Sequence, residues 1–127
     1  MKNLKFTGRT ITGSGRGKRI GVPTINLALE DIPPALEEGI YACFVTDHRF
    51  PAAVHYGPRP VFNDSKTFEI HLLDAALVLL PKEISVEIVA YLRPVKNFHD
   101  VDGLKAQITK DIADARAILK AHDDRSA

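Results

Sequence analysis

Residues 13–26 combine four glycines with three cationic side chains, followed by a proline and two oxygen-bearing side chains. Glycine lets backbone amides approach a ligand closely and adopts positive φ without steric cost. Arginine adds a fork of donors that matches phosphate oxygens. This composition predicts a cationic flap that closes over phosphates, formed by Gly13, Gly15, Arg16, Gly17, Lys18, Arg19 and Gly21. An ordinary glycine-rich hairpin leading into a strand remains the alternative.

The end of this stretch suggests a metal site. Pro23 favours an extended backbone at its own position and at the residue before it. If the chain continues extended, Thr24 and Asn26 project from the same side of a strand. A hydroxyl and an amide carbonyl are neutral oxygen ligands, and they suit a Mg²⁺ ion that keeps most of its waters and also binds a nucleotide phosphate.

The loop matches neither of two common phosphate-binding motifs. A P-loop needs Ser or Thr directly after its Gly-Lys pair, but Arg19 follows Gly17 and Lys18. The dinucleotide-binding fingerprint needs a third glycine where Ile20 stands. Any phosphate binding here would therefore use a different geometry.

Glu69 is the best candidate for acid–base chemistry. It lies in the middle of an alternating segment, on the same face as His71. A carboxylate on a rigid strand can accept the proton of a substrate hydroxyl. The alternative is a solvent-facing glutamate on an ordinary sheet, with His71 in a positioning or structural role. A metal site built from His55, His71 and His99 is weakly supported, because the three lie in separate segments without ligand spacing.

Composition narrows the class of protein. A chain of 127 residues fits one domain with a core of its own. A net charge of +1 argues against a nucleic-acid partner, and the absence of a long apolar run argues against a membrane partner. The single cysteine, Cys43, lies in an apolar segment typical of a buried structural thiol. A lone cysteine also fits the cytoplasm.

The apolar pattern predicts strands followed by one helix. Alternation and turn residues predict strands at 4–12, 24–29, 40–45, 50–56, 67–74, 77–80 and 83–92. Such a series is typical of a closed or nearly closed antiparallel barrel. From 101 to about 122, apolar residues recur at helical spacing, and Asp100 or Asp102 can cap the start. This helix is expected to pack on the barrel and to expose its charged face to solvent.

Taken together, the motifs resemble those of the riboflavin kinase (flavokinase) family. The matching segments are the glycine-rich loop with Pro-Thr-x-Asn at 23–26, Gly-Ile-Tyr at 39–41, Gly-Pro-Arg-Pro at 57–60, Glu-x-His-Leu-Leu-Asp at 69–74, and Tyr-Leu-Arg-Pro at 91–94. They occur in order over nearly the whole chain. The resemblance implies one riboflavin kinase-like domain over residues 1–127, with a six-stranded antiparallel Greek-key barrel and a C-terminal helix.

The resemblance also implies an activity, the transfer of the ATP γ-phosphoryl to the terminal ribityl hydroxyl of riboflavin. By the motif match, Thr24 and Asn26 would hold Mg²⁺ and Glu69 would be the base. The flap from Gly13 to Gly21, with Pro23 and Thr24, would bind the nucleotide, and Arg93 would lie at the flavin end. A monomer is expected. FAD synthesis is not, because no adenylyltransferase segment precedes residue 1.

Some positions depart from the family pattern. His55 stands where the family usually has Asn, and Val61 where it has Thr. After residue 74, the usual aromatic and Asp-Leu-Tyr-Gly turn are replaced by residues that include Ala75, Val78, Leu80 and Pro81. These changes leave open a catalytically impaired flavin- or nucleotide-binding relative. A barrel that binds single-stranded nucleic acid or protein is the third possibility, but the chain has few aromatic residues for base stacking.

Overall fold

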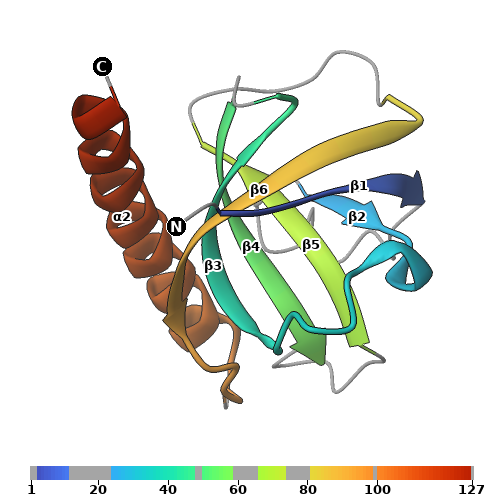
Figure 1. Cartoon of the computed structure of the whole chain (residues 1–127). Coiled ribbons are helices and arrows are strands. Elements are labelled where there is room, and N and C mark those ends of the chain that lie inside the picture. The colour runs from blue at the N-terminus through green and yellow to red at the C-terminus, as the bar shows by residue number, and fades with distance from the viewer. Residues whose placement is uncertain are drawn as a thin grey trace.

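Six strands form a closed antiparallel barrel, and one long helix lies against its outside (Figure 1). The computed structural model describes residues 3–11, 24–47, 50–58, 66–73, 81–98 and 100–126. The elements are β1 (Leu4–Ile11), β2 (Ile25–Leu27), the 3₁₀ turn η1 (Leu29–Asp31), β3 (Gly39–Val45), β4 (Phe50–Pro58), β5 (Lys66–Leu72), β6 (Glu83–Arg93) and α2 (Val101–Ser126). The predicted strand at 77–80 lies outside the described residues.

The strand order around the barrel is β1-β2-β5-β4-β3-β6, and the β1–β6 pair closes the ring. Strands β3, β4 and β5 are neighbours in sequence and in space, whereas β2 lies beside β5. Strand β6 returns to lie beside β3, and three consecutive strands with a fourth beside the first of them form a Greek key. The predicted barrel is therefore confirmed.

The second strand is shorter than predicted. Strand β2 ends at Leu27, not residue 29, and η1 follows. Asp31 accepts hydrogen bonds from the backbone N and from Nε of Arg9, both at 2.9 Å. These contacts hold η1 against β1, so the chain turns away where the apolar pattern alone would continue the strand.

The barrel interior is filled by alternate apolar residues of every strand. Phe68 is fully buried, and its ring contacts those of Phe6 and Tyr56 with centroids 5.8 Å and 5.5 Å away. Gly8 leaves room for Leu27, since a Cβ at residue 8 would lie 2.9 Å from a Leu27 methyl carbon. Because successive side chains of a strand point to opposite faces, the residues between these core positions face outward.

A second apolar cluster joins α2 to the outer face of β3, β4 and β6 (Figure 1). Ala42 and Ala53 are paired in register there, and their small side chains leave space for Ala115 and Leu119 of the helix. The backbone N of Gly103 donates to Asp100 Oδ1 at 2.7 Å, which makes Asp100 the cap. The predicted amphipathic helix is confirmed, and it extends through Ser126. Among the described residues, no helix is long and apolar enough to cross a membrane.

Candidate functional site

Three polar side chains form a row across the outer face of the barrel. In the strand register, Asn26 of β2 lies opposite Glu69 of β5, and Glu69 lies opposite His55 of β4. Their strand neighbours, including Ile25, Ile70 and Val54, belong to the interior core, so the three face outward. Asn26 and Glu69 are nevertheless only 5% and 7% exposed. The alternative of an ordinary solvent-facing Glu69 is therefore wrong.

The Glu69 carboxylate is held by its own strand. Thr67 Oγ1 donates a hydrogen bond to Oε1 at 3.1 Å. His71, on the same face, places its Nε2 3.8 Å from Oε2. That distance is too long for a direct hydrogen bond. One carboxylate oxygen is thus fixed by Thr67, and the other faces an imidazole.

Two buried imidazole nitrogens lie beside this carboxylate. In the described part of the chain, neither His55 Nε2 nor His71 Nε2 has a hydrogen-bond partner. Burial lowers the pKa of His55 to about 4, although the negative charge of Glu69 acts in the opposite direction. His55 is therefore neutral at pH 7. A buried polar group without a partner costs about 1–3 kcal/mol, so two such groups at one place are unusual in a folded protein.

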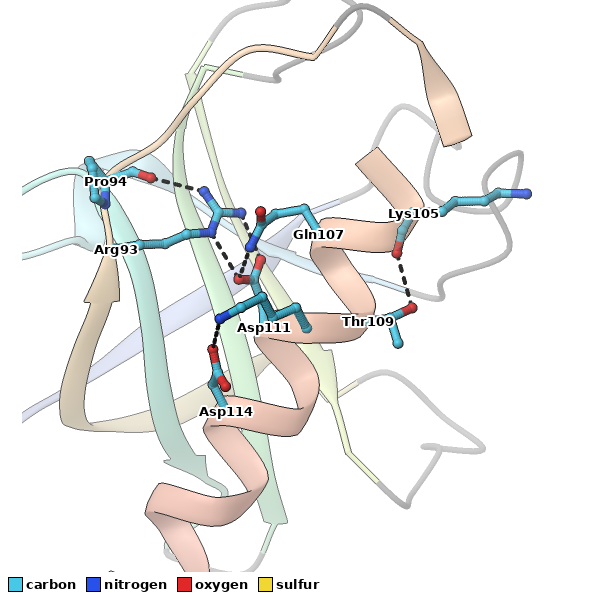
Figure 2. Close-up of polar contacts among 8 residues, drawn as sticks. Arg93, Pro94, Lys105, Gln107, Thr109, Asp111 and Asp114 are labelled. Atoms are coloured by element: carbon cyan, nitrogen blue, oxygen red, sulfur yellow. Dashed lines mark hydrogen bonds and ion pairs between the residues drawn. The ribbon is translucent and has the colours of Figure 1, made fainter. Parts of the chain in front are cut away.

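Arg93 connects the end of β6 to the helix (Figure 2). Its Nε donates to Asp111 Oδ1 at 2.8 Å and its Nη2 donates to Asp111 Oδ2 at 2.7 Å. Nη1 donates to the Pro94 carbonyl at 2.9 Å, and Gln107 Nε2 donates to Asp111 Oδ1 at 3.0 Å. The observed contacts of Arg93 are structural, and its role at the flavin end stays a prediction.

The remaining predicted site residues are only partly described. Thr24 is half-buried and lies directly before β2, two residues from Asn26, so the spacing expected of a metal-binding pair is retained. Asn26 lies opposite Glu69, and the neutral oxygens of Thr24 and Asn26 are of the kind that suits a hydrated Mg²⁺. No group of three His, Cys, Asp or Glu side chains suited to a metal is found within the described ranges. The predicted nucleotide-binding residues Gly13, Gly15, Arg16, Gly17, Lys18, Arg19, Gly21 and Pro23 lie outside them.

Two of the positions that depart from the family pattern, His55 and Pro81, are among the described residues. His55 is part of the polar row, and the Pro81 carbonyl accepts a hydrogen bond from Thr10 Oγ1 at 2.6 Å. Val61, Ala75, Val78 and Leu80 lie outside the described residues. Cys43 is completely buried in the barrel core, where desolvation raises the pKa of its thiol, as expected of a structural cysteine.

Sequence reasoning missed three residues of this region. The sequence suggests His55 only as a departure from the family pattern and as a member of a weak histidine metal site, and it does not single out Thr67. The expectation that the charged residues of α2 face solvent is wrong for Asp111, which is 6% exposed. Helical spacing was the available signal, because Asp111 is seven residues after Leu104 and four before Ala115 on the buried stripe.

Comparisons with known proteins agree with the family resemblance of the sequence motifs. The model of the riboflavin kinase family, Flavokinase, matches residues 1–119. The bifunctional riboflavin kinase/FMN adenylyltransferase of Escherichia coli K12 is 35% identical over 116 residues, which are 87% of this chain and 36% of that protein. The riboflavin kinase of Homo sapiens is 33% identical over 131 residues, which cover 94% of this chain and 84% of that protein.

Two solved structures share the fold. A riboflavin kinase from Trypanosoma brucei superposes with a TM-score of 0.63 at 20% identity, covering 94% of this chain and 82% of the other. A Streptococcus pneumoniae structure described as a macrolide-efflux protein gives a TM-score of 0.76 at 26% identity, covering 90% of this chain and 38% of the other. This chain spans about a third of the length of the bifunctional relatives. By its sequence match and by its barrel and helix, the chain belongs to the riboflavin kinase family.

Proposed function

We propose that this chain is a kinase that transfers the γ-phosphoryl of ATP to the terminal ribityl hydroxyl of riboflavin, giving FMN and ADP. The hydroxyl oxygen forms the new bond to phosphorus while the bond from the γ-phosphorus to the ADP oxygen breaks. The hydroxyl proton passes to Glu69. Phosphoryl transfer mainly requires that the protein position the reactants and neutralise charge, and the residues on this face of the barrel suit both tasks.

One observation carries the proposal: a buried carboxylate on a rigid strand lies in register with the amide of Asn26. Thr67 Oγ1 holds one oxygen of Glu69, which orients the carboxylate on its strand. A general base must be fixed in place and must remain able to take a proton. The sequence match to riboflavin kinases supports riboflavin as the acceptor and ATP as the donor.

Thr24 and Asn26 are the residues proposed to hold Mg²⁺. The ion would neutralise phosphate charge and orient the γ-phosphoryl group. Because both ligands are neutral, they leave the positive charge of the ion for the nucleotide. The register of Asn26 opposite Glu69 supports a metal ligand close to the proposed base.

The test is to incubate purified protein with riboflavin, ATP and Mg²⁺ and to separate the flavins by chromatography. FMN that forms only when all three are present supports the kinase. Riboflavin or ATP binding without FMN formation would instead support a catalytically impaired relative. No binding of either substrate would contradict the proposed function.

We predict that Thr24→Val and Asn26→Leu each raise the Mg²⁺ concentration needed for half-maximal activity by about tenfold, or roughly 1.4 kcal/mol of binding free energy. Both changes remove an oxygen ligand and keep the approximate shape of the side chain. The measurement is FMN formation across a Mg²⁺ titration at saturating riboflavin.

Thr7→Val is the matched control for Thr24, because Thr7 is exposed on β1 and lies opposite Ser85 of β6. It should leave the Mg²⁺ titration unchanged. A titration that is also unchanged in both site variants would show that Thr24 and Asn26 are not metal ligands.

A further inference from the structure

The outer face of the barrel holds two imidazoles that the proposed phosphoryl transfer does not use. His55 lies directly opposite Glu69 across the β4–β5 pair, and His71 lies two residues further along β5 on the same face. Side chains directly opposite each other have Cβ atoms about 4.5–5.5 Å apart. Both imidazoles therefore lie within reach of a molecule bound at the Glu69 carboxylate.

The geometry around these imidazoles fits a bound hydroxylic molecule. In the described residues, His55 Nε2 and His71 Nε2 are buried without a hydrogen-bond partner. His71 Nε2 is 3.8 Å from Glu69 Oε2, a separation at which an oxygen atom placed beside both can hydrogen-bond to each. Buried polar atoms left without partners at such a place are satisfied when a ligand supplies them.

The charge around the pair favours a neutral ligand. Burial lowers the pKa of His55 to about 4, so its ring is uncharged at pH 7. The guanidinium of Arg93, whose charge also lowers the pKa of His55 after the larger effect of burial, is already paired with Asp111. A neutral imidazole offers one donor and one acceptor, as a hydroxyl does. An anionic group on the acceptor would be repelled by Glu69, whereas the charge of the ATP phosphates would be neutralised by the proposed Mg²⁺. These features select polyols over anionic acceptors.

We propose that His55 and His71 bind the hydroxyl groups next to the one that is phosphorylated, and so make this chain selective for acceptors with vicinal hydroxyls. This inference rests on the proposed function and assigns the acceptor side of the same site. Glu69 takes the proton of the reacting hydroxyl, and the two imidazoles hold its neighbours. Neither histidine takes part in the bond-making step.

The test compares riboflavin with an analogue that keeps the terminal ribityl hydroxyl and lacks the adjacent one. We expect the wild-type chain to prefer riboflavin by about tenfold or more in kcat/KM. The double variant His55→Phe/His71→Phe should accept both flavins with nearly equal kcat/KM, since neither phenyl ring can recognise the missing hydroxyl. His55→Gln and His71→Gln, whose amide nitrogens reach about as far as Nε2, should retain the preference.

His122→Phe is the control for replacing a partly buried histidine. His122 lies near the end of α2 against Phe44, and it lines a separate cavity of about 390 Å³ with Lys5 and Glu87. Its replacement should leave the preference between the two flavins unchanged. A structural role for His55 and His71 would lower activity with both flavins equally, so an unchanged preference in the Phe variants overturns the proposal.

A failure of the kinase reaction itself is recognised separately. If the wild-type chain makes no FMN, flavin fluorescence still gives the dissociation constants of the two flavins. A preference for riboflavin that is present in the wild type and lost in the Phe variants supports the assignment of the histidines even then. Equal binding of both flavins by the wild-type chain, or binding of neither, contradicts it.

Discussion

Replacing Glu69 with Gln is expected to lower kcat by roughly two to four orders of magnitude while riboflavin and ATP still bind. Glutamine keeps the shape of the side chain and can still accept the hydrogen bond from Thr67 Oγ1. Its amide cannot take a proton from the ribityl hydroxyl. The measurements are steady-state FMN formation and a fluorescence titration with riboflavin.

Glu87→Gln is the matched control for this substitution. Glu87 is a half-buried glutamate on β6, and its Oε2 accepts a hydrogen bond from Asn3 Nδ2 at 2.9 Å. It lines the separate cavity near His122 instead of the polar row, so its replacement should leave kcat nearly unchanged. If the Glu69 variant also turns over at a nearly unchanged rate, Glu69 is not the base.

The barrel could be predicted because its strands carry a strong local signal. In β5, Phe68 and Ile70 alternate with Glu69 and His71, and the structure places the first pair inside and the second outside. The ends of elements depend on contacts with distant residues. Strand β2 stops at Leu27 because η1 is held by Arg9, and no local pattern in residues 24–29 contains that information.

The candidate site also combines residues that the sequence identifies with contacts that depend on strand register. Glu69 and Asn26 could be singled out by residue type and position, but their direct pairing depends on the register of β2 against β5. The place of His55 opposite Glu69 likewise depends on the β4–β5 register. A shift of one residue would have moved His55 to the core face. Sequence alone therefore singled out Glu69 but did not place His55 opposite it.

Asp111 differs from these residues, because the helical spacing of the apolar stripe is enough to predict its burial. It lies on the apolar stripe, where a carboxylate is expected only with a partner. The partner, Arg93, is 18 residues earlier and belongs to a strand, so no helical spacing identifies it. Burial lowers the pKa of His55, and the charge of Arg93 lowers it further by a smaller amount.

Asp111→Ala is expected to lower the free energy of unfolding by about 3–5 kcal/mol, because it leaves the Arg93 guanidinium buried without its carboxylate. The pair is bidentate, and the side chains of Arg93 and Asp111 are 18% and 8% exposed. Gln107 would lose its acceptor as well (Figure 2). Urea unfolding followed by circular dichroism measures the change.

Asp114→Ala is the control, because it shows how much the free energy of unfolding falls when an exposed carboxylate of the same helix is removed. Asp114 is one turn further along α2 and pairs with Lys110 at 2.9 Å, but these side chains are 46% and 68% exposed. Exposed pairs of this kind contribute about 0.3–0.5 kcal/mol.

The double variant Arg93→Met/Asp111→Leu removes both buried charges together, so it should recover much of the stability that Asp111→Ala loses. If Asp111→Ala costs no more than Asp114→Ala, the pair does not hold the helix to the barrel, and the apolar cluster around Ala115 and Leu119 must be sufficient for that contact.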